Sequence, residues 1–142
     1  MRDNNLTVIT PDECDALLRR SHLGRIAVVD KDLPLILPVN FVVDDADVVF
    51  RTNPGSKLDA ALRQAPVAFE IDGVDEQNRT GWSVLVRGFA HEVTDAAELA
   101  RLEQLAVVPW APGDNRHYIR VTSSQTSGRR ITVPSLPSDY WG

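Results

Sequence analysis

The segment FRTNPGSKLDAAL, residues 50–62, places two cationic side chains, two hydroxyl groups and a glycine around the start of an expected helix. Backbone N–H groups at a helix start, together with nearby cations, can bind an anion such as a phosphate. The candidate ligands are Arg51, Thr52, Ser56 and Lys57. The simpler interpretation is a capping box, in which Ser56 caps the helix, Asp59 follows three residues later and the cations face solvent. The residues alone leave both interpretations open.

The composition is that of a soluble protein with a single domain. Of the 142 residues, 43% are hydrophobic and 25% are charged, values that are ordinary for one globular domain. The net charge of −5 argues against general nucleic-acid binding, which needs a basic face. One cysteine cannot form an intrachain disulfide, and no segment reaches the roughly 18 apolar residues of a membrane span. We therefore expect a cytoplasmic protein that binds neither nucleic acid nor membranes.

Local patterns predict where the helices and strands lie. Strands are expected where β-branched and apolar residues run together, at 24–30, 33–45, 47–52, 66–72, 82–93 and 117–125, with a short one at 127–133. Short helices are expected after the capping residues Thr10, Ser56 and Asp95. Turns or irregular segments are expected at 44–47, 73–81 and 106–116.

These elements predict one mainly β domain over residues 1–142, with 134–142 as a tail. Six or seven strands joined mostly by short turns, with three short helices, favour an antiparallel β-barrel with the helices packed outside. A doubly wound parallel sheet would need a helix after nearly every strand. Within the barrel, Gly88 is expected at a bulge or a close backbone approach. Pro38 cannot donate to a ladder and is expected at an edge, a bulge or a ligand-facing break.

The order and spacing of these segments resemble the FMN-binding split β-barrel family, the pyridoxamine 5′-phosphate oxidase-like group, and in particular its small actinobacterial-type members. The segment FRTNPGSK follows a strand, LPVNF lies before it and GWSV after it, and the resemblance covers roughly residues 10 to 131. It implies a split antiparallel β-barrel of the FMN-binding type. It also implies a homodimer with two flavins bound at the interface.

The resemblance assigns the flavin contacts to three segments. Thr52, Ser56 and Lys57, with Arg51 beside them, match the positions that bind the flavin phosphate. The strand whose backbone would lie along the isoalloxazine ring consists of Leu37, Pro38, Val39 and Asn40. Trp82 and Ser83 match a segment that lines the same cleft, from this subunit or from the other one.

The resemblance does not determine the reaction. Pyridoxamine phosphate oxidases proper carry a tryptophan-containing stretch and an Arg-x-His pair at their end, whereas this chain has TSSQTSGRRITV and no such histidine. We expect an FMN-dependent oxidoreductase with an unknown small-molecule substrate or electron donor. The alternatives are a deazaflavin-dependent reductase of the same fold, a non-catalytic flavin-binding or carrier protein, and a structural interaction module.

The remaining residues give weaker signals. His22, His91, His117 and Cys14 have no metal-ligand spacing, so no metal site is predicted, and Cys14 is expected to be buried on its helix. Trp110 is expected either as a lid over the flavin or as a dimer contact. Together with Trp82 and Trp141 it needs burial, which favours a two-fold symmetric dimer.

Overall fold

The computed structural model describes residues 6–63, 65–105 and 117–132. In this part of the chain the strands are β1 (Leu6–Ile9), β2 (Leu23–Asp30), β3 (Leu33–Asp44), β4 (Asp47–Thr52), β5 (Ala65–Asp75), β6 (Thr80–Glu92) and β7 (His117–Ile131). The helices are α1 (Pro11–Arg20), α2 (Lys57–Ala61) and α3 (Ala96–Glu103).

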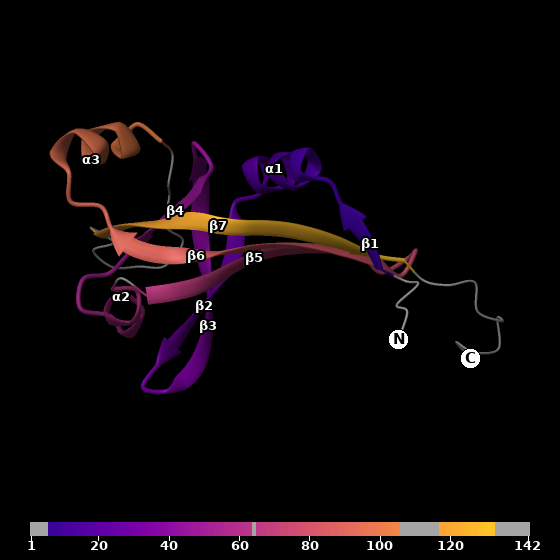
Figure 1. Cartoon of the computed structure of the whole chain (residues 1–142), viewed down its shortest axis with the longest axis horizontal. Helices are drawn as coiled ribbons and strands as arrows, with labels where there is room; N and C mark the ends of the chain where they lie inside the picture. Colours follow the sequence, from indigo (N-terminus) through magenta and orange to yellow (C-terminus); the bar gives the residue numbers. More distant parts are fainter. Residues whose placement is uncertain (1–5, 64, 106–116, 133–142) are drawn as a thin grey trace.

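The sheet closes on itself. Its strand order is β1-β7-β4-β3-β2-β5-β6, and β6 pairs in turn with β7, so that β2 to β7 form a ring. All pairings among the described strands are antiparallel. In Figure 1 the long strands β5, β6 and β7 run along the molecule, β2 and β3 cross them, and α1 lies on one side of β7. The predicted fold, a split antiparallel β-barrel with short helices outside it, is confirmed.

The barrel encloses an apolar core. Its largest fully buried side chains include Phe50, Phe69, Ile26, Leu62 and Ile71. The rings of Phe41 and Phe69 pack edge to face, with centroids 4.7 Å apart. A second, smaller cluster of Val49, Val93, Leu102 and Tyr118 attaches α3 to the sheet.

Each helix begins directly after the residue predicted to cap it. The side chains of Thr10, Ser56 and Asp95 accept a hydrogen bond from the N–H group three residues later, at 3.3, 3.1 and 2.9 Å. Cys14 is buried on α1, as predicted. Within the described residues, no helix has the length and apolar character that a membrane crossing requires.

The main differences from the sequence prediction concern β1, β7 and the turn between β5 and β6. The sequence does not predict β1, because four residues with one buried side chain give no clear alternation. The strands expected at 117–125 and 127–133 form the single strand β7, because β6 holds the polar residues between them in its ladder. The turn expected at 73–81 shortens to 76–79, since Gly73–Asp75 pair with residues 80–82 of β6.

Gly88 lies at a β-bulge and at a close backbone approach, as predicted. The register between β6 and β7 shifts there, so that Arg87 lies opposite Gln125 while Gly88 lies opposite Ser123. A Cβ atom at Gly88 would be 2.0 Å from the carbonyl oxygen of Thr122, so the backbone would have to move to accept it.

Replacing Gly88 with alanine should therefore destabilise the barrel by about 1–3 kcal/mol, the usual cost of overpacking. Gly81→Ala is the matched control on the same strand, because a Cβ atom there would meet only the carbonyl oxygen of Gly73, at 3.4 Å. Urea unfolding of both variants measures the difference. Equal free energies of unfolding would show that the close approach at Gly88 is not the constraint.

The outer edge of β3 has no partner strand over residues 33–39, because in the described chain β4 pairs only with the last four residues of β3. The N–H group of Phe41 donates to the carbonyl oxygen of His22, at 3.1 Å, and so points toward the β2 side. Backbone N–H directions alternate along a strand, so the nitrogens of Pro34 and Pro38 point away from β2. Neither proline removes a hydrogen bond from the β2–β3 ladder.

Candidate functional site

The turn after β4, residues 52–56, is organised by one buried carboxylate. Asp59 is 4% exposed, and its Oδ1 atom accepts a hydrogen bond from the hydroxyl group of Thr52, at 2.9 Å. Its Oδ2 atom accepts from the N–H group of Gly55, at 3.2 Å. Gly55 has a φ of 75°, in the left-handed region that favours glycine. The carboxylate of Asp59 thus connects both ends of the turn.

The capping interpretation of this turn is correct for Ser56, but it does not exclude a ligand. Ser56 Oγ accepts the N–H group of Asp59, which leaves the hydroxyl proton of Ser56 for another acceptor. Thr52 is 3% exposed and donates its single hydroxyl proton to Asp59. Lys57 is the first residue of α2, and its side chain is outside the described part of the structure. Phosphate binding by these residues stays a prediction.

Arg51 lies on the other face of β4 from Thr52, because neighbouring side chains in a strand point to opposite sides. Its guanidinium carbon is 5.2 Å from the centroid of the Tyr118 ring, within the range of a cation–π contact. Tyr118 belongs to the small cluster below α3. The Arg51 side chain is therefore held against Tyr118 at the end of β4, on the face of the strand opposite to Thr52.

His117 completes the group around Asp59. It lies opposite Thr52 in the β4–β7 register, and its Nδ1 atom is 2.8 Å from Oδ1 of Asp59 and 3.4 Å from Oε1 of Glu92. Burial opposes the ionisation of Asp59, but hydrogen bonds from His117, Thr52 and Gly55 outweigh it and lower the pKa of this carboxyl below its usual value. Asp59 is therefore an ionised group inside the turn at neutral pH.

The predicted ring-contact strand adjoins this turn. The β3–β4 ladder ends at the pair Phe41–Phe50, so residues 37–40 of β3 continue past the end of this ladder, on the side of Arg51 and Thr52. The side chains of Leu37 and Val39 pack against the core, whereas Pro38 is exposed on the outer face. Asn40 is half-buried, and its Nδ2 atom donates to the carbonyl oxygen of His22 at 3.4 Å. One chain thus brings two of the three predicted flavin-contact segments together.

Trp82 and Ser83 lie elsewhere in the same chain. Trp82 faces Gly73 of β5 and covers it, since a Cβ atom on that glycine would be 2.4 Å from the indole Nε1 atom. The opposite end of β6 is Glu92, which contacts His117. The ten residue steps from Trp82 to Glu92 span about 33 Å along an extended strand. A single chain therefore does not place Trp82 and Ser83 beside the turn.

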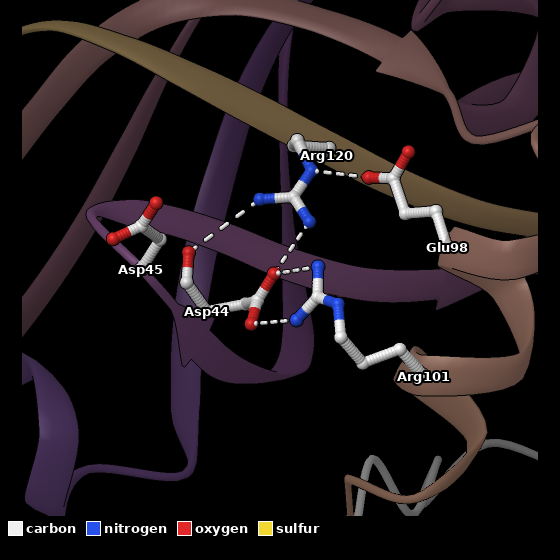
Figure 2. Close-up of a pocket in the computed structure, with 5 residues that line it drawn as sticks. All are labelled: Asp44, Asp45, Glu98, Arg101 and Arg120. Carbon is white, nitrogen blue, oxygen red and sulfur yellow. Dashed lines mark hydrogen bonds and ion pairs between the residues drawn. The ribbon is translucent and has the colours of Figure 1, made fainter.

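A cleft of about 490 Å³ lies where the β3–β4 hairpin, α3 and β7 meet, and it is lined by Asp44, Asp45, Glu98, Arg101 and Arg120. Figure 2 shows Asp44 pointing at both guanidinium groups: Arg101 donates to it at 2.5 and 2.8 Å, and Arg120 at 2.5 Å. Arg120 also donates to Glu98 at 2.9 Å and to Asp47 at 3.1 Å. We call the ion-paired residues Asp44, Asp47, Glu98, Arg101 and Arg120 the Asp44 ion network.

The Asp44 ion network is a structural connection between α3 and the barrel. Hydrogen bonds from Arg101 and Arg120 outweigh burial and lower the pKa of Asp44 to about 2. The carboxylates and guanidinium groups of the network are ion-paired with one another, so few of their hydrogen-bonding groups remain to bind a ligand. The sequence predicts Asp44 and Asp47 only as turn residues, and no described residue of the predicted flavin site lines this cleft.

The outer face of β2, β5 and β6 carries a small charge cluster among exposed apolar side chains. Arg25 Nη1 is 2.7 Å from Asp72 and 3.3 Å from Glu70, which lies opposite Arg25 in the register. Burial and the Asp72 carboxylate raise the pKa of Glu70 to about 7, against the effect of Arg25. Leu23 and Phe89 are 46% and 56% exposed on the same face. This face therefore combines a charge cluster with exposed apolar side chains.

The structure thus defines a class of protein: a small split antiparallel β-barrel with a polar turn between its fourth strand and its second helix. Comparison with known proteins then places the chain within that class. The sequence model of the family described as pyridoxamine 5′-phosphate oxidase matches residues 10–130. The chain belongs to this family, as the resemblance in the sequence predicts.

Three of the similar proteins come from actinobacteria, the group whose small members the sequence resembles. The uncharacterized protein Rv0080 of Mycobacterium tuberculosis is 36% identical over 129 residues, which are 87% of this chain and 84% of that protein. The structure of the FAD binding protein from Mycobacterium smegmatis is 38% identical, with a TM-score of 0.78, and the match covers 89% of this chain and 99% of that chain. A conserved protein of unknown function from Corynebacterium diphtheriae is 32% identical, with a TM-score of 0.74 and coverage of 92% and 100%.

Proposed function

We propose that the protein binds a flavin nucleotide and acts as a flavin-dependent oxidoreductase on a small molecule. The proposal rests on the similarity to a protein described as FAD-binding. This chain is 38% identical to that protein, and the match covers 99% of that protein's chain. FMN, the flavin predicted from the sequence, and FAD share the isoalloxazine ring and the phosphate next to its ribityl chain. One phosphate-binding turn can therefore serve either cofactor.

Of the predicted residues Arg51, Thr52, Ser56 and Lys57, the side chains of Arg51, Ser56 and Lys57 are proposed to hold the flavin phosphate, while Thr52 is proposed to shape the turn through its bond to Asp59. The structure supports a polar role for the turn, because Arg51 is held at the end of β4, directly before it, and the hydroxyl proton of Ser56 is not used by the cap. The backbone of Leu37–Asn40 is proposed to lie along the flavin ring. Over residues 37–39 its outer edge has no partner strand in the described chain, so the backbone groups there can meet a ligand. When bound, the flavin would supply the hydride or electron transfer, and these residues would bind and orient it.

A second copy of the chain is proposed to complete the site. Trp82 and Ser83 lie about 33 Å along β6 from the end that contacts His117, so in the proposed site they come from the partner copy. The exposed apolar side chains on the outer face of β2, β5 and β6 favour burial against that copy. Trp110 and Trp141, which the sequence also assigns to burial, lie outside the described residues.

Sedimentation at micromolar concentration should therefore show a dimer. Its interface should bury more than about 2,000 Å² in total, the size of obligate dimers. Mixing two variants extends the test, one changed at Trp82 and one changed at Ser56, each with weakened flavin binding. Their mixed dimers should contain one site in which Ser56 of one copy and Trp82 of the other are both unchanged, so that some flavin binding returns. A stable monomer that still binds flavin would contradict the shared site.

The absorption spectrum of the purified protein, before and after addition of FMN, FAD or a deazaflavin coenzyme, tests the function. A band near about 450 nm would support a flavin, whereas a band near about 420 nm would support the deazaflavin alternative. Turnover with a nicotinamide donor would then separate an oxidoreductase from a carrier protein. If none of the three cofactors binds, the proposed function is wrong.

A further inference from the structure

Asp59 connects three elements of the barrel. It accepts hydrogen bonds from Thr52 at the end of β4 and from Gly55 in the turn, and it pairs with His117 at the start of β7. We propose that Asp59 and His117 are positioning residues, which hold turn 52–56 in the shape that receives the flavin phosphate. This inference rests on the proposed function and adds two residues to it that do not themselves contact the phosphate.

Asp59 is suited to shape the turn and not to bind the anion. Its side chain is 4% exposed, and three donors already occupy its two oxygens, at 2.8, 2.9 and 3.2 Å. A carboxylate would also repel a phosphate that it contacted directly. Its contribution is therefore to fix the hydroxyl group of Thr52 and the N–H group of Gly55, so that the remaining donors of the turn face the ligand.

His117 is suited to hold Asp59. An ionised carboxylate only accepts hydrogen bonds, so the short Nδ1–Oδ1 distance of 2.8 Å requires a proton on Nδ1 of His117. Among the described residues, the charged groups paired with this ring are Asp59 of α2 and Glu92 of β6, the latter at 3.4 Å from Nδ1. Without His117, the buried Oδ1 atom would keep Thr52 alone as a donor, and the carboxylate could rotate away from Gly55.

The pairing of these residues is fixed by the barrel and not by local sequence. Thr52 and His117 are direct neighbours in the β4–β7 register. Asp59 lies in α2, seven residues after Thr52. A change at the start of β7 can therefore alter the turn after β4 without any change in the turn itself. The structure assigns a long-range support to a site that the sequence presents as a local motif.

The test compares His117→Leu, which removes the donor, with His117→Asn, whose amide N–H group can occupy the place of Nδ1. His91→Leu is the matched control, a histidine on β6 outside the group around Asp59. FMN affinity is measured by the quenching of flavin fluorescence, and the thermal unfolding of each variant is measured without flavin. We expect His117→Leu to weaken FMN binding about 10-fold, the equivalent of one hydrogen bond to a charged group. His117→Asn should bind within about 3-fold of the parent, and His91→Leu should bind as the parent does.

The inference is overturned if folded His117→Leu binds FMN as tightly as the parent, even where its unfolding temperature falls, because His117 would then be merely structural. It is also overturned if His117→Asn is no better than His117→Leu. A parent that binds neither FMN nor FAD refutes the proposed function separately. In that case the amide NMR signal of Gly55 tests whether His117 holds the turn. This signal should shift in His117→Leu and return to its parent position in His117→Asn. If it is unchanged in His117→Leu, His117 does not hold the turn.

Discussion

Replacing Arg120 with methionine should lower the free energy of unfolding by about 3–5 kcal/mol, the usual effect of removing one partner from a buried ion pair. The Arg120 side chain is 10% exposed and holds Asp44, Asp47 and Glu98, so its loss leaves the buried Asp44 with Arg101 as its remaining cation. Urea unfolding at neutral pH measures the effect. Arg101→Met is the matched control, because this guanidinium is 53% exposed and its loss should lower the free energy of unfolding by less than the loss of Arg120.

The same ion network predicts how acid affects the fold. The folded-state pKa of Asp44 is about 2, below its ordinary value of 3.8, so ionised Asp44 stabilises the fold above about pH 4. This stabilisation should be lost as the pH falls from about 4 toward 2, and Asp44→Asn should flatten that part of the stability curve. Parallel curves for the parent and Asp44→Asn over this range would contradict the assignment.

Replacing Lys57 with alanine should weaken FMN binding about 10- to 100-fold, the loss of a charge-assisted hydrogen bond to a phosphate. Its effect on stability should be about 0.5 kcal/mol or less, as for most surface substitutions. Ser56→Ala should also weaken FMN binding and should in addition cost about 1 kcal/mol of stability, because Ser56 caps α2. Titration of FMN against each variant, with a thermal melt of each, measures both quantities.

Arg63→Ala is the control for charge alone, since Arg63 is an exposed cation just after α2. Arg63→Ala should leave FMN affinity unchanged, because Arg63 is not among the proposed phosphate contacts and salt screens an exposed charge. If Lys57→Ala binds FMN as tightly as the parent, the phosphate site lies elsewhere and the segment serves only as a helix cap.

Features of the fold that depend on neighbouring residues could be predicted from the sequence. The caps at Thr10, Ser56 and Asp95 are interactions over three residues, and each was visible as a pattern of residue types. The bulge at Gly88 and the short turn after Asp44 are local in the same sense. Strand β1 could not be predicted, because its place depends on the far end of β7 and not on its own four residues.

The supports of the candidate site could not be predicted, because they join distant parts of the chain. His117 and Asp59 are 58 residues apart, and Arg120 and Asp44 are 76 residues apart. Only the closed ring of strands brings each pair together, and a charged residue in a strand or a turn gives no sign of its partner. The family resemblance supplied the three candidate segments, but it did not supply the residues that hold them.

The two prolines on the outer edge of β3 affect how copies of the protein meet in solution. An exposed edge normally offers alternating donors and acceptors, onto which a strand from another molecule can be added. Here Pro34 and Pro38 remove donors at two of the outward positions, so an added strand would leave carbonyl groups without partners. We therefore expect this edge to resist the addition of strands from other copies of the protein. The same edge still presents its carbonyl oxygens and its remaining N–H groups to a flat molecule that needs only a few of them.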